Sequence, residues 1–150
     1  MPVTLSIQKG LRLPPAFPVS RREIMTLSGD LLDVLGLSGS SFDLHLVGDA
    51  DMARRNAEFM GCVGPTNVLS FPAGEQGVTG EEGETGQEPW LGELVLSVDT
   101  LEREAFLYGQ PSREHLVRLL AHGVLHLAGH DHGELMEALT EQAVDMLGGD

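Results

Sequence analysis

The sequence predicts a single α+β domain, in which a small mixed sheet of four strands packs against about five helices. The chain has 150 residues, enough for one domain with its own apolar core. Short segments in which apolar and polar residues alternate are typical of strands, and longer segments with apolar residues three and four apart are typical of helices. These segments follow one another without an internal repeat. Residues 1–150 are therefore expected to form one α+β domain.

The first two elements carry clear signals. Residues 3–8 alternate between apolar and polar side chains, which predicts a strand. Ser20 is a suitable N-cap for a helix over 21–36, and Glu23 follows three residues later, as in a capping box. Gly36 is of the residue type that commonly follows a helix end. The helix is expected to end at this glycine.

The middle of the chain supplies two further strands. Residues 42–47 alternate again and predict a strand, and 49–60 favour a short helix. Residues 66–71 are rich in strand-forming side chains and are stopped by Pro72. The segment 73–90 is rich in glycine and glutamate and has no basic residue, which predicts a flexible surface loop.

The last third of the chain is mostly helical. Residues 94–98 predict the fourth strand, and helices are expected over 99–108, 112–128 and 134–147. The helix over 112–128 is apolar on most sides, so we expect it to be buried in the centre of the domain.

Composition limits the possible functions. The net charge of −14 argues against broad affinity for nucleic acids, which depends on Lys and Arg, and no DNA partner is expected. The single cysteine, Cys62, allows no internal disulfide and fits a reducing cytoplasm. The chain starts without a signal-peptide pattern. Its longest apolar stretch, 116–129, is interrupted by charged and imidazole side chains, so no membrane span is expected.

Three histidines in the predicted central helix and just after it predict a metal site. His122 and His126 stand four apart and share one helix face. Gly129 can adopt the left-handed conformation that ends the helix, and His132 can then return as a third ligand. Three imidazoles with an open fourth position are typical of catalytic zinc sites. One zinc ion per chain is expected, at the end of the buried helix.

The same spacing occurs in zinc peptidases of the H-E-x-x-H-x-x-G-x-x-H type. Those enzymes use the glutamate after the first histidine as general base, and here that position is Gly123. A peptidase would need a base from elsewhere in the chain, such as Glu93.

Two other polar residues lie on the same stripe of this helix. His115, Arg118, His122 and His126 follow one another at steps of three, four and four residues. Arg118 is a candidate catalytic residue that could stabilise a phosphate oxyanion beside the metal. The alternative, which we favour, is that Arg118 pairs with Glu114 at i, i+4.

Asp131 and His130 lie in the turn before the third ligand. Asp131 could accept a hydrogen bond from a metal-bound imidazole, or could be an ordinary turn residue. It is the second candidate catalytic residue. His130 cannot easily point the same way as His132, so it is expected to lie outside the ligand set.

Three segments of the sequence resemble one protein family. The run from His122 to His132 resembles the signature H-G-x-L-H-L-x-G-[YH]-D-H of the YbeY-type bacterial rRNA maturation factors. The segments 65–72 and 91–95 are similar to the family's P-T-[DN]-V-L-S-F-P and L-G-D-[IL]-V motifs. The resemblance covers about residues 43–148.

The resemblance implies a metal-dependent, single-strand-specific endoribonuclease with an α+β fold. It implies a zinc-like ion on His122, His126 and His132, and action in maturation of the 16S rRNA 3′ end and quality control of the small ribosomal subunit. The implied partners are rRNA, that subunit, and ribosomal or assembly proteins. The alternatives are a zinc peptidase-like hydrolase, and a ribosome-assembly binding protein whose metal site is mainly structural.

The chain departs from the family pattern at three places. The family usually has a Tyr-Arg pair where this sequence has Phe59 and Met60, so a cation associated with RNA cleavage is missing. Glu93 replaces the usual aspartate. The acidic stretch after the last histidine is short, with only residues 133–135 before Met136.

Overall fold

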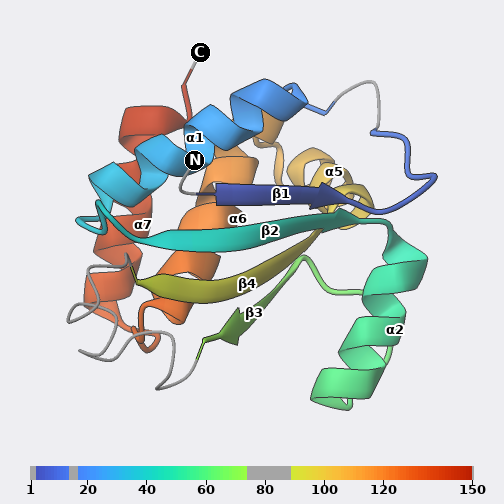
Figure 1. Ribbon diagram of the computed structural model, residues 1–150. Coiled ribbons are helices and arrows are strands. Elements are labelled where there is room, and N and C mark those ends of the chain that lie inside the picture. Colours follow the sequence, from blue (N-terminus) through green and yellow to red (C-terminus); the bar gives the residue numbers. More distant parts are fainter. Residues whose placement is uncertain (1–2, 14–16, 74–88, 150) are drawn as a thin grey trace.

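The computed structural model describes residues 3–13, 17–73 and 89–149, and its four strands form one mixed sheet (Figure 1). The strand order is β1-β2-β4-β3. Strands β1 (Val3–Ile7), β2 (Ser41–Val47) and β4 (Trp90–Ser97) are parallel to one another. Strand β3 (Val68–Pro72) runs antiparallel to β4 and forms one edge of the sheet.

Helices cover the sheet unequally. Helices α6 and α7 lie behind the sheet in Figure 1, and α1 lies above strand β1, with its apolar residues in the same core. Helix α2 adds Met52 to a smaller core on the opposite face. The α-helices of the described residues are α1 (Arg21–Val34), α2 (Asp49–Met60), α5 (Val98–Tyr108), α6 (Ser112–Leu127) and α7 (Glu134–Leu147). None of them is long and apolar enough to cross a membrane. The mixed sheet with its helices confirms the predicted α+β class.

Helix α6 is the centre of the domain. It packs against β3 and β4 of the sheet and against α1, α5 and α7. Strand β2 turns Phe42, Leu44 and Leu46 into the main core beside this helix. The alternate residues Asp43 and His45 therefore point to the opposite face of the sheet. The expectation of a buried central helix is confirmed, because most of its residues are buried.

The capping box predicted for α1 is present. The Ser20 hydroxyl accepts a hydrogen bond from the Glu23 backbone N–H at 3.1 Å, and the Glu23 carboxylate accepts one from the Ser20 N–H at 3.0 Å. The helix ends at Val34, and the predicted terminal residue Gly36 follows with φ +76°. The predicted boundary is thus two residues too long.

Strand β4 shows the largest difference from the prediction. It starts at Trp90, four residues before the expected start at 94. Gly92 lies inside the strand with φ +133°, and a Cβ there would be 2.2 Å from the carbonyl oxygen of Phe71. The glycine allows β3 and β4 to approach closely. Most of the predicted loop over 73–90 lies outside the described residues.

Candidate metal centre and substrate groove

The three predicted metal ligands come together at the end of α6. His122 and His126 lie one turn apart, with ring centroids 4.7 Å from each other. The ring of His132 lies 5.0 Å from that of His122 and 4.6 Å from that of His126. The potential ligand atoms of the three side chains all lie within 4.8 Å of one another.

A glycine turn returns the chain to the helix end. Gly129 has φ +95°, a left-handed conformation that other residues rarely adopt. The His130 N–H donates to the Leu125 carbonyl at 3.0 Å, and the Gly129 N–H donates to the His126 carbonyl at 3.0 Å. This pair of bonds is the Schellman motif, which satisfies the last carbonyls of α6. It also directs residues 131 and 132 back toward the helix end, as the sequence predicted.

The geometry and chemistry of the three imidazoles fit a zinc ion. The Nε2 atoms of His122 and His126 are 3.2 Å apart. Two nitrogens on one tetrahedral zinc would be roughly 3.3 Å apart, given Zn–N bonds of about 2.0–2.1 Å. Burial, and then the neighbouring imidazoles of His126 and His132, lower the pKa of His122. The neutral imidazole favoured in this way is the form that binds metals.

Gly123 cannot be replaced by a peptidase glutamate without disturbing the core. A Cβ at this position would lie 2.8 Å from Cδ2 and 3.2 Å from Cδ1 of Leu94, a fully buried side chain. The Gly123 carbonyl also accepts a hydrogen bond from Ser70 at 3.4 Å. The other candidate base, Glu93, lies on the opposite face of the sheet, because its neighbour Leu94 points toward α6. This geometry argues against the peptidase alternative.

The two residues that precede His132 lie outside the set of three imidazoles. Asp131 is exposed and, within the described residues, makes no hydrogen bond to a histidine ring. His130 is half-buried and is not among the grouped ligands. The structure thus leaves Asp131 exposed to solvent, next to His132 in the chain.

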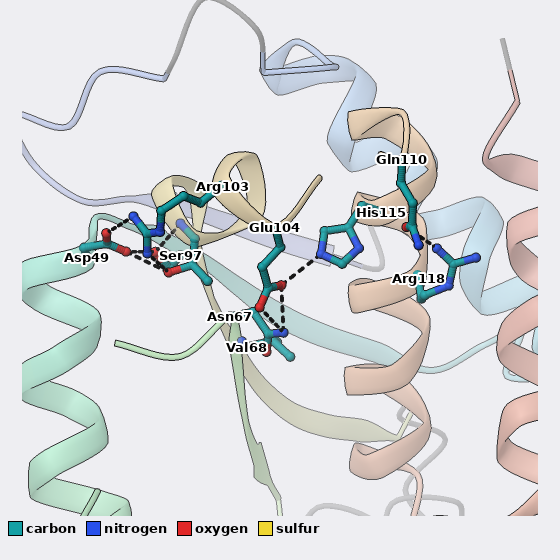
Figure 2. Close-up of polar contacts among 10 residues, drawn as sticks. Asp49, Asn67, Val68, Ser97, Arg103, Glu104, Gln110, His115 and Arg118 are labelled. Carbon is teal, nitrogen blue, oxygen red and sulfur yellow. Dashed lines mark hydrogen bonds and ion pairs between the residues drawn. The ribbon is translucent and has the colours of Figure 1, made fainter. Parts of the chain in front are cut away.

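Arg118 lies one turn before His122 but is held by other groups (Figure 2). Its guanidinium donates two hydrogen bonds to the Glu141 carboxylate, both at 3.1 Å, and one to Gln110 at 2.6 Å. The predicted pair with Glu114 is present as a longer contact of 3.5 Å. The hydrogen bonds that Arg118 donates to Glu141 raise the pKa of Arg118, so its guanidinium keeps its positive charge and is already paired.

Two hollows meet at His122. The first lies between α6 and α7, and the second lies between α6 and the edge strand β3. The first is lined by Arg118, His122, His132, Gly133, Met136, Glu137, Thr140 and Glu141. The second is lined by Met60, Asn67, Val68, Leu69, Ser70, Pro72, His122 and His126. Together we call these hollows the groove. A linear polymer could therefore extend to both sides of the histidine cluster.

Met60, at the position where the family resemblance leads us to expect an arginine, lies in this groove. Met60 is 58% exposed and lines the second hollow together with His122 and His126. The basic pair Arg54 and Arg55, earlier on the same helix, is bound to Asp51 rather than placed in the groove. Among the described residues, Arg118 is the one lysine or arginine of the groove lining, and it is paired with Glu141.

Helix α2, which ends at Met60, is fixed at its start by α5 (Figure 2). The Asp49 carboxylate accepts hydrogen bonds from Ser97 at 2.9 Å, Thr100 at 2.7 Å and Arg103 at 2.6 Å. Burial acts to raise the pKa of Asp49, but these hydrogen bonds outweigh it and lower the pKa.

A buried polar network behind the groove was not predicted from the sequence. His115 is 4% exposed, and its Nε2 lies 2.9 Å from the carboxylate of Glu104, which in turn accepts hydrogen bonds from Asn67 at 3.0 and 3.4 Å. Figure 2 shows this chain of contacts from α6 through α5 to the segment before β3. The predicted polar stripe therefore divides into three separate sites: His115 contacts Glu104, Arg118 pairs with Glu141, and His122 lies with His126 in the histidine cluster. Only the motif around Asn67 marked this region in the sequence.

The chain is similar in sequence to proteins of one family. The family model described as Endoribonuclease YbeY matches residues 20–147. The Endoribonuclease YbeY of Nitratidesulfovibrio vulgaris is 50% identical over 136 residues, which are 84% of this chain and 83% of that protein. The Endoribonuclease YbeY of Oleidesulfovibrio alaskensis is 44% identical over 142 residues, 83% of this chain and 81% of that protein.

A solved structure has the same fold. The solution structure of TM1509 from Thermotoga maritima aligns with a TM-score of 0.63 and 22% identity, over 95% of this chain and 87% of that one. Together with the matches in sequence, these findings confirm the predicted relationship. The chain belongs to the YbeY endoribonuclease family.

Proposed function

We propose that this protein is a metal-dependent endoribonuclease that cleaves single-stranded RNA. The observation that carries the proposal is the position of three imidazoles where two hollows meet, so that an RNA strand could continue on both sides of the cleaved bond. The relatives named endoribonuclease support the same reaction class.

In this proposal His122, His126 and His132 hold one zinc ion. All-imidazole ligation favours zinc. When bound, such an ion supplies Lewis-acid chemistry, because it polarises a phosphoryl oxygen and lowers the pKa of water. The groove residues along β3 position the RNA strand. The 2′-hydroxyl of the RNA is an internal nucleophile.

Asp131 and Arg118 are the proposed catalytic side chains. Asp131 is exposed next to His132, so its carboxylate can exchange a proton with the reacting hydroxyl or leaving group. The Arg118 N–H groups that would bind a phosphate now donate to the Glu141 carboxylate. To bind a phosphate oxygen, Arg118 would therefore have to break its hydrogen bonds to Glu141.

The proposed setting is the cytoplasm, with the small ribosomal subunit as partner and the 3′ end of 16S rRNA as substrate. The net charge of −14 gives weak attraction for naked RNA, because Arg118, the one arginine or lysine that lines the groove among the described residues, is already paired with Glu141. Basic ribosomal and assembly proteins can instead meet this acidic surface, which would bring the groove to the rRNA.

Comparison of two histidine variants tests the proposal. His126→Ala should lose one equivalent of zinc relative to the unmodified protein and should lose RNA cleavage, whereas His130→Ala should keep both. Zinc content is measured by elemental analysis, and cleavage by incubation with single-stranded RNA, with casein as the control substrate. If the His126→Ala variant cleaves RNA as fast as the unmodified protein, or if casein is the substrate that is cut, the proposal is wrong.

A further inference from the structure

The face of the sheet opposite to α6 carries a second group of metal-binding side chains. Asp43 and His45 lie two residues apart on β2 and therefore share a face, and Glu93 lies on the adjacent strand β4. Sheet pairing places Asp43 directly beside Glu93. The potential ligand atoms of the three side chains all lie within 4.8 Å of one another, and all three residues are half-buried.

The arrangement concentrates negative charge that lacks a cation. Carboxylates directly opposite each other on neighbouring strands repel. Among the described residues, neither Asp43 nor Glu93 pairs with a lysine or arginine. In the part of the chain that the structure describes, the basic group in contact with them is His45, whose Nε2 lies 2.9 Å from a carboxylate oxygen of Glu93.

The surroundings of Glu93 increase the effect of this charge. Phe71 on β3 pairs with Glu93 in the sheet. The ring of Phe59 packs edge-on against the ring of Phe71, with 5.5 Å between the ring centroids. An apolar border lowers the local dielectric constant, which strengthens both the repulsion between the carboxylates and their attraction for a cation.

We propose that Asp43, His45 and Glu93 form a second divalent metal site, separate from the three-histidine site. One imidazole and two carboxylates are a donor set that suits zinc and also manganese or iron(II). The 2.9 Å between His45 Nε2 and a carboxylate oxygen of Glu93 is close to the roughly 3.0 Å between neighbouring ligands of an octahedral ion with bonds of about 2.1 Å, and a tetrahedral zinc would need the two atoms to move apart by about 0.4 Å. To bind the same ion, the Asp43 side chain would have to move more than the other two. The sheet fixes the position of its backbone beside Glu93.

The two sites lie on opposite faces of the sheet. Leu94 packs against Gly123 of α6, so Glu93, the residue before it, points away from the three histidines. An ion on the second site would join β2 to β4 and would not touch the groove. Its expected effect is on stability, because binding to the folded state alone stabilises that state.

Metal titration tests the second site. With Zn²⁺ alone as the probe, the unmodified protein should bind two equivalents and the variant His122→Ala/His126→Ala should bind one. Asp43→Asn/Glu93→Gln should also bind one, and the combination of all four substitutions should bind none. Isothermal titration calorimetry gives the stoichiometry. Zn²⁺ should also raise the melting temperature of the His122→Ala/His126→Ala variant.

Matched controls separate ligation from general charge effects. Glu58→Gln/Asp145→Asn removes the same two charges from exposed helix positions and should keep both equivalents. His45→Asn should lose the second equivalent with the carboxylates intact. The proposal is overturned if the unmodified protein binds one equivalent, if Asp43→Asn/Glu93→Gln still binds two, or if the control variant loses the second equivalent as well.

Discussion

Gly123→Ala should destabilise the protein, although alanine is the better helix former. The added methyl group would lie 2.8 Å from Cδ2 and 3.2 Å from Cδ1 of Leu94, a fully buried side chain that would have to shift within the core to make room. Overpacking of this kind costs about 1–3 kcal/mol, against a gain of about 1 kcal/mol from helix propensity. Two close contacts favour the upper part of that range, so we expect a net loss of about 1–2 kcal/mol.

Thermal unfolding measures this loss. A change of 1 kcal/mol shifts the melting temperature of a domain of this size by about 2–4 °C, so the expected fall is about 2–8 °C. Leu94→Val removes both Cδ atoms, and in that background Gly123→Ala should instead stabilise by about 1 kcal/mol. If Gly123→Ala raises the melting temperature of the otherwise unmodified protein, or has the same effect in both backgrounds, the close-packing argument fails.

Four further predictions concern the groove and its support. Met60→Arg should raise RNA cleavage by about 10²–10³, because it adds a cation beside the histidines; unchanged kinetics would contradict this, especially if Arg118→Ala abolishes cleavage. Asp131→Asn should lower kcat by about 10²-fold or more with zinc content unchanged. Asp49→Asn should lower the free energy of unfolding by about 1–3 kcal/mol at pH 7, as measured by chemical denaturation. Because folding lowers the pKa of Asp49, this difference in stability between the two proteins should disappear as the pH falls through that lowered pKa. Binding to naked single-stranded RNA should show a slope of about −1 in log affinity against log salt, and a slope steeper than about −4 would indicate a basic groove that is absent from the described residues.

Most elements of the fold could be predicted because their signals are local. The capping box at Ser20 and the alternation in β2 depend on residues a few positions apart. The start of β4 could not be predicted in this way. Gly92 is inside that strand because the backbone of Phe71, from another strand, lies next to it. No pattern within residues 90–94 reveals that contact.

The same distinction applies to the site. The grouping of His122, His126 and His132 depends on one helical turn and one glycine turn, so the spacing in sequence was enough to predict it. The partners of other groove residues come from distant segments. Arg118 pairs with Glu141, which is 23 positions away, and the contact between Asn67 and Glu104 spans 37 positions. Such contacts follow from the packing of the elements, which the sequence pattern does not specify.

The central claim is that the three-histidine groove cleaves RNA with the help of a metal. The most direct test incubates zinc-loaded and metal-free protein with precursor 16S rRNA in small subunits, and maps the RNA 3′ ends. The account predicts new 3′ ends with the loaded protein, none with the metal-free protein or with His126→Ala, and recovery when zinc is returned to the metal-free protein. Equal cleavage by the loaded and metal-free proteins, or no cleavage by either, would contradict it.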